Sequence, residues 1–411
     1  MLYLFMANIN EGRQKIYWAE SRMGIISTVR ENFRKNMPFK GIKIGMALHL
    51  EAKTAVLAKT LKEGGAEVYI TSCNPLTTDD DVASSLSEIM HVYAKRGQTR
   101  DEYYESLNKV LDAEPDIIID DGGDLTTLLH TERNLKIMGG NEETTTGVMR
   151  LKIMEKDGVL KFPMFDVNDA EMKHLFDNRY GTGQSTIDGI MSTTNLLIAG
   201  KNAVVAGYGW CGRGIASRLR GMGAKVTVTE VDPVKAIEAH MDGFHVKRME
   251  DAIKDADIVI TATGVKDIVR KEHFLRAKNG CIFANSGHFD VEINKNDLMS
   301  LSREVKSVRR YVDEYTLHDG RRLYLLGEGR LINLVGGQGH PVEIMDLSFS
   351  IQALTAEYIV KNHAKLEKRV YPVPKEIDRG VAEIALKVFG IQKDELTEEQ
   401  VKYINSWNVG T

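Results

Sequence analysis

The chain of 411 residues is long enough for two or three domains, and its composition, 43% hydrophobic and 27% charged, is typical of a soluble globular protein. Its 54 basic and 58 acidic residues leave a formal net charge of −4, which gives no support to a nucleic-acid or anionic-membrane partner. The apolar opening MLYLFM is too short for a signal peptide, and no later stretch reaches the roughly 18 apolar residues of a membrane span. Three widely spaced cysteines indicate reduced thiols, so we expect a cytoplasmic protein. The small net charge and the lack of a long apolar stretch predict no membrane partner.

The first part of the chain is predicted to be helical and then to alternate between strands and helices. Apolar residues at helical spacing predict one amphipathic helix over 12–36. Strands are then predicted at 42–48, 66–71, 91–94 and 116–120, and helices at 52–65, 82–90 and 102–111. Alternation of this kind implies a parallel sheet with helices on both faces.

A second α/β unit is predicted from residue 201, followed by a long helix over 343–363 and a charged tail. Between the two units, residues 168–186 predict a short helix that presents Lys173 and Asp177 four residues apart, followed by Asn178. Gly181 and Gly183 then predict a loop, where a hinge would lie. On local pattern alone, the Lys173–Asp177 pair is either a surface salt bridge or catalytic machinery beside a hinge.

Three glycines, Gly207, Gly209 and Gly212, follow a predicted strand and open a predicted helix in VVAGYGWCGRG. This is the context that a dinucleotide-binding turn requires, because it allows a tight turn, close approach to the pyrophosphate and close helix–strand packing. Glu230 ends the next strand, where an acid accepts hydrogen bonds from ribose hydroxyls and repels a 2′-phosphate. The pattern therefore favours NAD over NADP, although Lys235 nearby weakens that preference slightly.

Polar residues collect where the strands of the first unit end, and ligands of open parallel sheets bind at this edge. His49 follows one strand, Cys73 another, and the DDGGD segment at 120–124 a third. Taken singly, His49 is more often a structural histidine, and DDGGD is a capped turn or a metal site. No His or Cys stands at ligand spacing, so no metal is predicted. EETTTG at 142–147 and the histidines of two glycine-bearing loops, His288 and His340, are equally ambiguous in isolation.

Together these motifs resemble the S-adenosylhomocysteine hydrolase family, and the resemblance covers nearly the whole chain. The matching segments, in family order, are HLEAKTAVL, NPLTTDDDVA, IIDDGGDLT, EETTTGV, FDNRYGTGQS, VVAGYGWCGRG, TEVDPVKA, GHFDVEI, EGRLINL and GHPVEIMDLSF. The combination of DDGGDLT with EETTTG ahead of a mid-chain dinucleotide motif makes the resemblance specific.

The resemblance implies two doubly wound parallel-sheet α/β domains joined by hinges, with a small C-terminal helical tail. The first part of a substrate domain would span 1–180 and a Rossmann NAD-binding domain 181–338. A return hinge with a further substrate-domain segment would span 339–372, and an oligomerisation tail 373–411. Family members are homotetramers that hold NAD tightly, so we expect a homo-oligomer.

The implied reaction is the reversible hydrolysis of S-adenosylhomocysteine to homocysteine and adenosine. Oxidation of the 3′-hydroxyl acidifies the C4′ proton, homocysteine leaves by β-elimination, water adds, and the 3′-ketone is reduced again. NAD is regenerated in each turnover and behaves as a catalyst.

The resemblance also assigns residues to roles. The catalytic residues are His49, Asp121, Lys173, Asp177 and His288. The substrate-binding residues are Glu51, Lys53, Thr54, Glu143, Thr144, Asn178 and His340. The NAD-binding residues are Thr144, Thr145, Thr146, Asn178, Gly207, Gly209, Trp210, Cys211, Gly212, Glu230, Thr263, Ser286, His288 and Asn333. Lys173 would take the 3′-hydroxyl proton, with desolvation favouring its neutral amine. The division of proton transfers among the other groups stays open.

The chain departs from the family at three places. Animal members carry HMTVETA where this chain has HLEAKTA, so Glu51 and Lys53 stand at the purine-reading positions; a lysine can only donate, which would suit the 6-oxo group of hypoxanthine. S-inosylhomocysteine is therefore an alternative substrate, since Glu51 could still accept from adenine. Thr182 replaces a common cysteine near the nicotinamide. The tail YINSWNVGT lacks the Lys and Tyr that reach a neighbour's NAD, which predicts looser NAD retention.

Two rival functions follow from the same motifs. A dehydrogenase of a small hydroxy or amino acid would have the same two-domain plan and would release NADH, but it leaves DDGGDLT and EETTTG without a task. A nucleotide-sensing binding protein would be expected to lose a proton-transfer residue, and all five are present.

Overall fold

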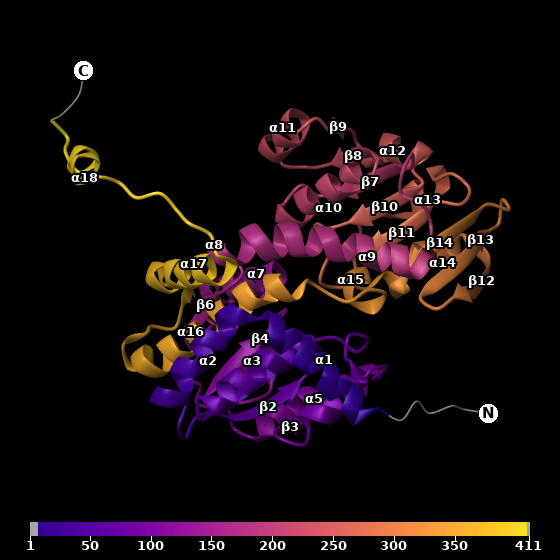
Figure 1. The fold of residues 1–411 in the computed structure, drawn as a ribbon. Coiled ribbons are helices and arrows are strands. Elements are labelled where there is room, and N and C mark those ends of the chain that lie inside the picture. Colours follow the sequence, from indigo (N-terminus) through magenta and orange to yellow (C-terminus); the bar gives the residue numbers. More distant parts are fainter. Residues whose placement is uncertain (1–6, 409–411) are drawn as a thin grey trace.

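The computed structural model describes residues 7–408. Two expectations fall partly outside the described residues. One concerns the apolar opening MLYLFM, which is expected to be too short for a signal peptide, and the other concerns the end of the tail, which predicts looser NAD retention. Within that described range, no helix is long and apolar enough to cross a membrane. The chain forms two α/β units, each built around its own sheet, with long helices running between them (Figure 1).

The N-terminal region forms two helices, α1 (Ile9–Arg22) and α2 (Gly24–Asn36), so the prediction of a single helix was wrong. The break lies at Met23, which is fully buried with φ −100° and ψ 72°. The carboxylate of Asp346, more than 300 residues later, accepts hydrogen bonds from the backbone N–H groups of Ile25 at 2.8 Å and Ile26 at 2.7 Å. This distant carboxylate satisfies the free N–H groups that begin α2. A cap from so far along the chain has no local sequence signature.

The first unit contains a seven-stranded parallel sheet in the order β15-β6-β5-β4-β1-β2-β3. Its strands are β1 (Lys43–Ala47), β2 (Glu67–Thr71), β3 (His91–Val92), β4 (Ile117–Asp120), β5 (Gly139–Glu142), β6 (Met164–Asp166) and β15 (Val370–Pro372). The strand β15 comes from the far end of the chain and pairs Val370 with Met164 at one edge. The sheet is therefore completed only after the chain has built and left the second unit.

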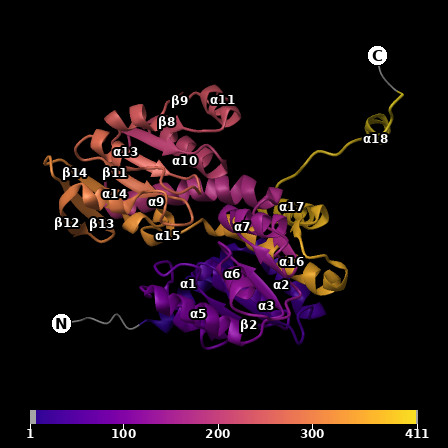
Figure 2. The same ribbon diagram turned by 180° about the vertical axis from the view of Figure 1, so that it is seen from behind.

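Helices cover both faces of this sheet, as the alternating pattern predicted (Figures 1 and 2). They are α3 (Ala52–Glu63), α4 (Asp80–Leu86), α5 (Arg100–Asp112), α6 (Asp124–Thr131), α7 (Thr145–Lys156), α16 (Val342–Asn362), the short η4 (His363–Lys365) and α17 (Lys375–Phe389). The helix predicted over 82–90 ends earlier, at Leu86, and the strand predicted over 91–94 is only two residues long. The other predicted strands and helices of this unit are confirmed to within about two residues.

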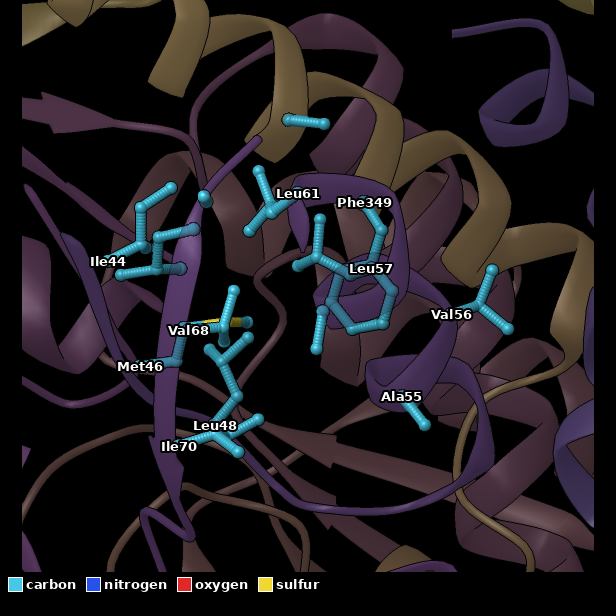
Figure 3. Close-up of a cluster of buried hydrophobic side chains, with 14 of the residues drawn as sticks. Ile44, Met46, Leu48, Ala55, Val56, Leu57, Leu61, Val68, Ile70 and Phe349 are labelled. Carbon is cyan, nitrogen blue, oxygen red and sulfur yellow. The ribbon is translucent and has the colours of Figure 1, made fainter. Parts of the chain in front are cut away.

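The core of the first unit lies between the strands and two helices from opposite ends of the sequence. Ile44, Met46 and Val68 of the sheet lie in one buried cluster with Leu57 of α3 and Phe349 of α16 (Figure 3). All are almost completely buried, and each side chain of this size contributes about 1.5–3 kcal/mol when removed from water. The contact of Phe349 makes α16 part of the first unit.

The two units are joined by an unbroken helical segment that consists of α8 (Glu171–Lys173), a π-helical stretch η1 (His174–Gly181) and α9 (Thr182–Thr194). The prediction of a loop at Gly181 and Gly183 was wrong. A Cβ at Gly183 would lie 2.7 Å from the backbone oxygen of Gly214, and a Cβ at Gly181 would lie 2.1 Å from Cδ2 of His340. Both glycines are required by close packing, not by a chain break.

The second unit contains an eight-stranded sheet in the order β12-β13-β14-β11-β10-β7-β8-β9. Its strands are β7 (Asn202–Ala206), β8 (Lys225–Thr229), β9 (His245–Val246), β10 (Ile258–Thr261), β11 (Ile282–Asn285), β12 (Ser302–Arg309), β13 (Val312–Leu317) and β14 (Arg322–Leu326). All neighbours from β9 to β14 pair in parallel, and β13 pairs antiparallel with β14 and with β12. The predicted α/β class with parallel-sheet domains is confirmed, with an antiparallel extension at one edge.

Short helices surround the second sheet: α10 (Trp210–Gly221), α11 (Pro233–Met241), α12 (Met249–Ala252), η2 (Ile253–Asp255), α13 (Lys271–Arg276), α14 (Lys295–Ser300), η3 (Gly327–Gly329) and α15 (Ile332–Val335). After α17, the chain extends away from both units to a final helix, α18 (Glu398–Ile404) (Figures 1 and 2). The domain boundaries given from the sequence stay predictions.

Candidate functional site

Two adjoining cavities lie where the strand ends of both sheets meet the connecting helices. One has a volume of about 130 Å³ and the other about 830 Å³. Both are lined by Thr144, Thr145, Cys211, Ser286 and His288. The geometry therefore offers a small chamber, the smaller cavity, that adjoins a larger groove.

The structure brings together almost all of the residues singled out in the sequence. The smaller cavity is lined by every predicted catalytic and substrate-binding residue and by Asn333. The larger cavity is lined by the predicted residues Thr144, Thr145, Thr146, Gly207, Gly209, Cys211, Glu230, Thr263, Ser286 and His288. Trp210 and Gly212 line neither cavity. Trp210 lies between His174, with ring centroids 5.0 Å apart, and the guanidinium of Arg213 at 4.6 Å.

Lys173 is the centre of a buried polar cluster. Its Nζ donates to Oδ1 of Asn178 at 2.9 Å and lies 3.4 Å from a carboxylate oxygen of Asp177 and 3.4 Å from one of Glu143. Because Lys173 and Asp177 lie four residues apart across the start of η1, both side chains reach the same face. The pair is almost completely buried, so the reading as a surface salt bridge is wrong.

The ionisation of this cluster differs from the sequence expectation. Desolvation lowers the pKa of Lys173, but the carboxylates of Asp177 and Glu143 outweigh it and leave the pKa raised. The expectation of a neutral amine is therefore wrong for this arrangement, because burial comes with two negative partners. Burial raises the pKa of Glu143 to about 7 despite the opposing effect of Lys173. The pKa of Asp177 is lowered, because Lys173 and His340 outweigh its own desolvation.

Two residues missed by sequence reasoning support these carboxylates from α16. The hydroxyl of Ser348 donates to Asp177 at 2.8 Å, and the amide of Gln352 donates to Glu143 at 2.5 Å. Both are fully buried. Two polar residues four apart within a long apolar helix are the local signal that could have found them, since buried polar groups require partners.

A second cluster brings together three side chains that follow strands: His49 after β1, Asp121 after β4 and His288 after β11. The Nε2 atom of His49 and the Nδ1 atom of His288 each lie 3.5 Å from an oxygen of Asp121, one on each side of the carboxylate. The hydroxyl of Thr77 contacts Nδ1 of His49 at 2.8 Å, and the thiol of Cys73 donates to Asp121 at 3.4 Å. Burial lowers the pKa of His49 to about 4, against the opposing charge of Asp121, so this imidazole is neutral at physiological pH.

His49, Asp121 and His288 are also a set of donors that could hold a metal ion, because one ligand atom from each lies within 4.8 Å of the others. Two histidines and a carboxylate are common zinc ligands. Residues this far apart in sequence show no ligand spacing, which is why sequence reasoning missed the set. The expectation of no metal stays a prediction.

At one end of the smaller cavity, Glu51 and Lys53 form an ion pair of 2.8 Å at the start of α3. The Glu51 carboxylate also caps the helix by accepting from the backbone N–H groups of Lys53 and Thr54. Lys53 Nζ reaches across to the backbone oxygen of Gln338 at 2.9 Å. The Thr54 hydroxyl donates to the backbone oxygen of His49 at 2.6 Å, so it orients this segment.

His340 closes the chamber from the loop before α16. Its Nε2 atom lies 3.0 Å from the Thr182 hydroxyl and 3.5 Å from Asp177. Desolvation lowers its pKa against the opposing charge of Asp177, so the ring is neutral. Neutral His340 can therefore accept a proton or a hydrogen bond.

The glycine turn of the second unit fits a dinucleotide. Gly207 has φ +96°, which a glycine adopts without strain. A Cβ at Gly212 would lie 2.0 Å from the backbone oxygen of Gly207, whereas a Cβ at Gly209 would meet no protein atom within 4 Å. Gly212 thus permits tight packing, and Gly209 leaves its surface open for a pyrophosphate at the start of α10.

The two ends of the expected NAD site also fit. The Glu230 carboxylate lies at the end of β8 and is held by the backbone N–H groups of Tyr208 at 2.7 Å and Val231 at 2.7 Å, where it can accept from ribose hydroxyls. At the other end, the Oδ1 atom of Asn333 is buried without a hydrogen-bond partner among the described residues, and its amide donates to Ser185. An unpaired buried amide oxygen suits the carboxamide of a nicotinamide.

Comparison with known proteins agrees with this geometry. A family model described as S-adenosyl-L-homocysteine hydrolase matches residues 5–136, and its NAD binding domain matches 178–339. An adenosylhomocysteinase of Thermoplasma acidophilum is 61% identical, covering 98% of this chain and 99% of that protein. An S-inosyl-L-homocysteine hydrolase of Methanocaldococcus jannaschii is 62% identical, covering 98% and 97%. An adenosylhomocysteinase of Archaeoglobus fulgidus is 58% identical, covering 98% and 100%.

These matches cover nearly the full length of this chain and of each relative, and they therefore include the glycine turn and both buried clusters. The NAD binding model spans the segment whose glycine turn has the open surface at Gly209 and the acid at Glu230. The chain therefore belongs to the S-adenosyl-L-homocysteine hydrolase family, and NAD is its cofactor.

Proposed function

We propose that this protein reversibly hydrolyses S-adenosyl-L-homocysteine to homocysteine and adenosine, with the inosine analogue as a second candidate substrate. The observation that carries the proposal is that one small chamber contains two separate proton-transfer clusters, around Lys173 and around Asp121, and adjoins the dinucleotide groove. A simple alcohol dehydrogenation needs one such group. Two groups suit a reaction that works on neighbouring carbons of a ribose.

NAD, when bound, supplies the reversible oxidation of the ribose 3′-hydroxyl. Lys173 would hold the 3′-oxygen by donating a hydrogen bond from its ammonium, whose charge also stabilises negative charge developing on that oxygen. Lys173 would take up the proton of the 3′-hydroxyl as it passes one of its own protons to Asp177 across their 3.4 Å contact, and Asp177 in turn lies 3.5 Å from His340. His340 is neutral and would hold that proton only transiently, because burial lowers its pKa. Glu143 and Asn178 would hold the ribose beside this path.

The second cluster would act at C4′ and C5′. A ketone at C3′ acidifies the C4′ proton, and removal of that proton lets the C5′–S bond break, with the sulfur taking a proton as homocysteine leaves. Water then adds to C5′. Asp121 lies between His49 and His288, so the three groups form a relay able to move both protons. The family resemblance assigns these proton transfers to the three groups together and does not divide them.

The choice of purine is proposed to depend on Glu51 and Lys53. Adenine offers a donor amine beside an acceptor nitrogen, and hypoxanthine offers an acceptor oxygen beside a donor nitrogen. A carboxylate beside an ammonium can pair with either arrangement. Lys53 uses two of its three donors, on Glu51 and on the Gln338 backbone, which leaves one for the 6-oxo group of hypoxanthine. The inosine compound is therefore a second candidate.

The first experiment is homocysteine release by NAD-loaded protein, with the adenosine and inosine compounds assayed side by side. Comparable or faster release from the adenosine compound supports the primary proposal, whereas release from the inosine compound alone identifies the second candidate. Net accumulation of NADH without thiol release would refute both and indicate a dehydrogenase. A Lys173→Met variant should bind substrate but lose turnover by roughly 10³-fold, because the 3′-oxygen loses its charged partner.

We also propose that the protein is a cytoplasmic homo-oligomer, in the way that its family resemblance implies. Support comes from α18 and its flanks, which carry the exposed apolar side chains of Leu396, Val401, Ile404 and Trp407 away from both units (Figure 1). Exposed apolar side chains on a helix that packs against neither unit within the described residues are typical of an interface element.

A further inference from the structure

Glu142, a residue to which the reaction above assigns no role, lies between the two clusters. It is the last residue of β5, and the register of the sheet pairs it with Asp120 of β4 on one side and Asp166 of β6 on the other. Three carboxyl groups therefore lie in a row at the end of the first sheet. Glu142 is the central one, and it is completely buried.

The two neighbours in this row have partners suited to a carboxylate. Asp120 accepts from both the backbone N–H and the hydroxyl of Thr126 at 2.8 Å. Asp166 lies 3.1 Å from the ammonium of Lys152. Glu142 contacts no basic side chain, and among the described residues its Oε2 atom has no hydrogen-bond partner.

The other oxygen of Glu142 joins two loops. Oε1 accepts from the backbone N–H of Gly122 at 2.8 Å and from the backbone N–H of Thr144 at 3.0 Å. Gly122 directly follows Asp121, and Thr144 directly follows Glu143. A single atom therefore sets the distance between the turn that carries Asp121 and the loop that carries Glu143.

The surroundings are shaped around this contact. A Cβ at Gly147, in the first turn of α7, would lie 2.1–2.3 Å from the three carboxyl atoms of Glu142, so the helix can approach only because this residue is a glycine. Gly122 has φ +98°, and a Cβ there would lie 2.2 Å from Nε2 of His288. Arg150 donates to the backbone oxygen of Gly122 at 2.6 Å, which holds the turn from its other side.

The environment favours the protonated acid at Glu142. Burial raises its pKa well above the usual range, and the nearby carboxylates of Asp120 and Asp121 raise it further against the two backbone donors. A proton on Oε2 leaves Oε1 free to accept both N–H groups. A charge at this position would instead repel Asp121, only one residue from the Gly122 contact.

We propose that Glu142 is a positioning residue whose carboxyl group ties the Asp121 turn to the Glu143 loop and so holds the two proton-transfer clusters at their working separation. The kinetic part of this proposal rests on the proposed function. Its structural part, the tie between residues 122 and 144, does not depend on any activity.

The matched test compares Glu142→Gln with Glu142→Ala. Glutamine is neutral and keeps an oxygen that accepts both N–H groups, so its kcat should stay within about threefold of the wild type, with the same pH profile. Alanine removes the acceptor and should lower kcat by roughly 10²-fold, because small displacements of reacting groups cost that much. Equal loss in both variants would overturn the proposal by showing that a charged carboxylate is required, and wild-type rates in Glu142→Ala would overturn it by showing that the tie is dispensable.

A Gly147→Ala variant tests the same contact from the other side, because its Cβ would displace the carboxyl group. Gly380→Ala is the control, since a Cβ at that helical glycine would meet no atom within 4 Å. Amide hydrogen exchange of the peptides that contain residues 122 and 144 should quicken in Glu142→Ala and Gly147→Ala but not in Glu142→Gln or Gly380→Ala. Unchanged exchange in Glu142→Ala overturns the tie itself. Because exchange needs no substrate, this result is independent of whether the proposed hydrolysis is found.

Discussion

At the scale of single residues, the site is governed by which buried group has a partner of opposite charge. Lys173 is buried with two carboxylates and keeps its proton, whereas His49 is buried with one and loses it. Desolvation disfavours the charged form in both cases; two carboxylates outweigh it at Lys173, whereas at His49 the single carboxylate of Asp121 does not, and His288 and His340 lower the pKa further. Burial alone therefore does not predict the protonation state.

The depressed pKa of His49 predicts a pH dependence of stability. The imidazole has a pKa of about 4 in the folded protein and about 6.5 when unfolded, so the unfolded state binds more protons between these values. Its contribution to stability is complete above pH 6.5 and is lost as the pH falls through 4. Between pH 7 and pH 5 the free energy of unfolding of the wild type should fall by about 2 kcal/mol more than that of His49→Gln.

Urea denaturation at both pH values measures this difference. His91→Gln is the control, because that histidine side chain is half exposed and lies at the edge of the first sheet. If the wild type and His49→Gln lose stability in parallel, His49 is not held neutral by the fold.

At the scale of elements, the glycines of the segment α8–η1–α9 allow close packing of neighbouring groups and do not break the helix. The π-helical stretch places Asp177 and Asn178 inside the site, and the helix continues through Gly181 without a break. π-Helical turns often occur at functional sites, where they shift side chains relative to a regular helix. The connection between the units therefore also lines the smaller cavity.

A Gly181→Ala substitution separates helix propensity from packing. Alanine favours an isolated helix by about 1 kcal/mol, but its Cβ would lie 2.1 Å from Cδ2 of His340. We expect the helix to remain and His340 to be displaced from Thr182 and Asp177, so that kcat/KM falls on the order of 10²-fold. Steady-state kinetics with circular dichroism measures both effects.

Gly221→Ala in α10 provides the comparison, since its Cβ would meet no atom within 4 Å and should leave the kinetics unchanged. Full activity in Gly181→Ala would show that the loop carrying His340 yields without loss.

At the scale of the whole molecule, contacts near the chamber hold the two units together. Lys53 donates to the backbone oxygen of Gln338, and Arg96 donates to that of Val335 at 3.1 Å while its guanidinium lies 5.4 Å from the ring of Tyr311. Lys53 lies in the first turn of α3 and Arg96 in the loop after β3, so both reach from the first unit to the second. The smaller cavity is lined by residues of both units and therefore depends on their relative position.

Because α18 lies away from both units and exposes apolar side chains, we expect self-association of the protein to depend on them. Serine at both Val401 and Ile404 should weaken self-association without affecting the two units, because neither residue is buried in its own subunit. Sedimentation velocity at micromolar concentration should show smaller species for this double variant. Lys402→Ser in the same helix controls for loss of helix propensity. The same sedimentation coefficient in wild type and double variant would contradict the role given to this helix.

Much of this protein could be predicted from its sequence, because the informative patterns are local. Period-two and period-3.6 hydrophobicity located most strands and helices of the first unit, and the glycine turn with Glu230 indicated a dinucleotide site, since each needs only neighbours in the chain. The family resemblance named the site residues, and the structure places nearly all of them around two adjoining cavities.

Only the tertiary structure decided the features that depend on residues far apart in the chain. The cap that Asp346 supplies to α2, the pairing of β15 with β6, the supports from Ser348 and Gln352, and the tie made by Glu142 all join distant segments. The charge on Lys173 belongs to the same class, because a pKa depends on the sum of desolvation and nearby charges. Local sequence determined the elements and the chemical groups, and packing decided which groups meet and in which protonation state.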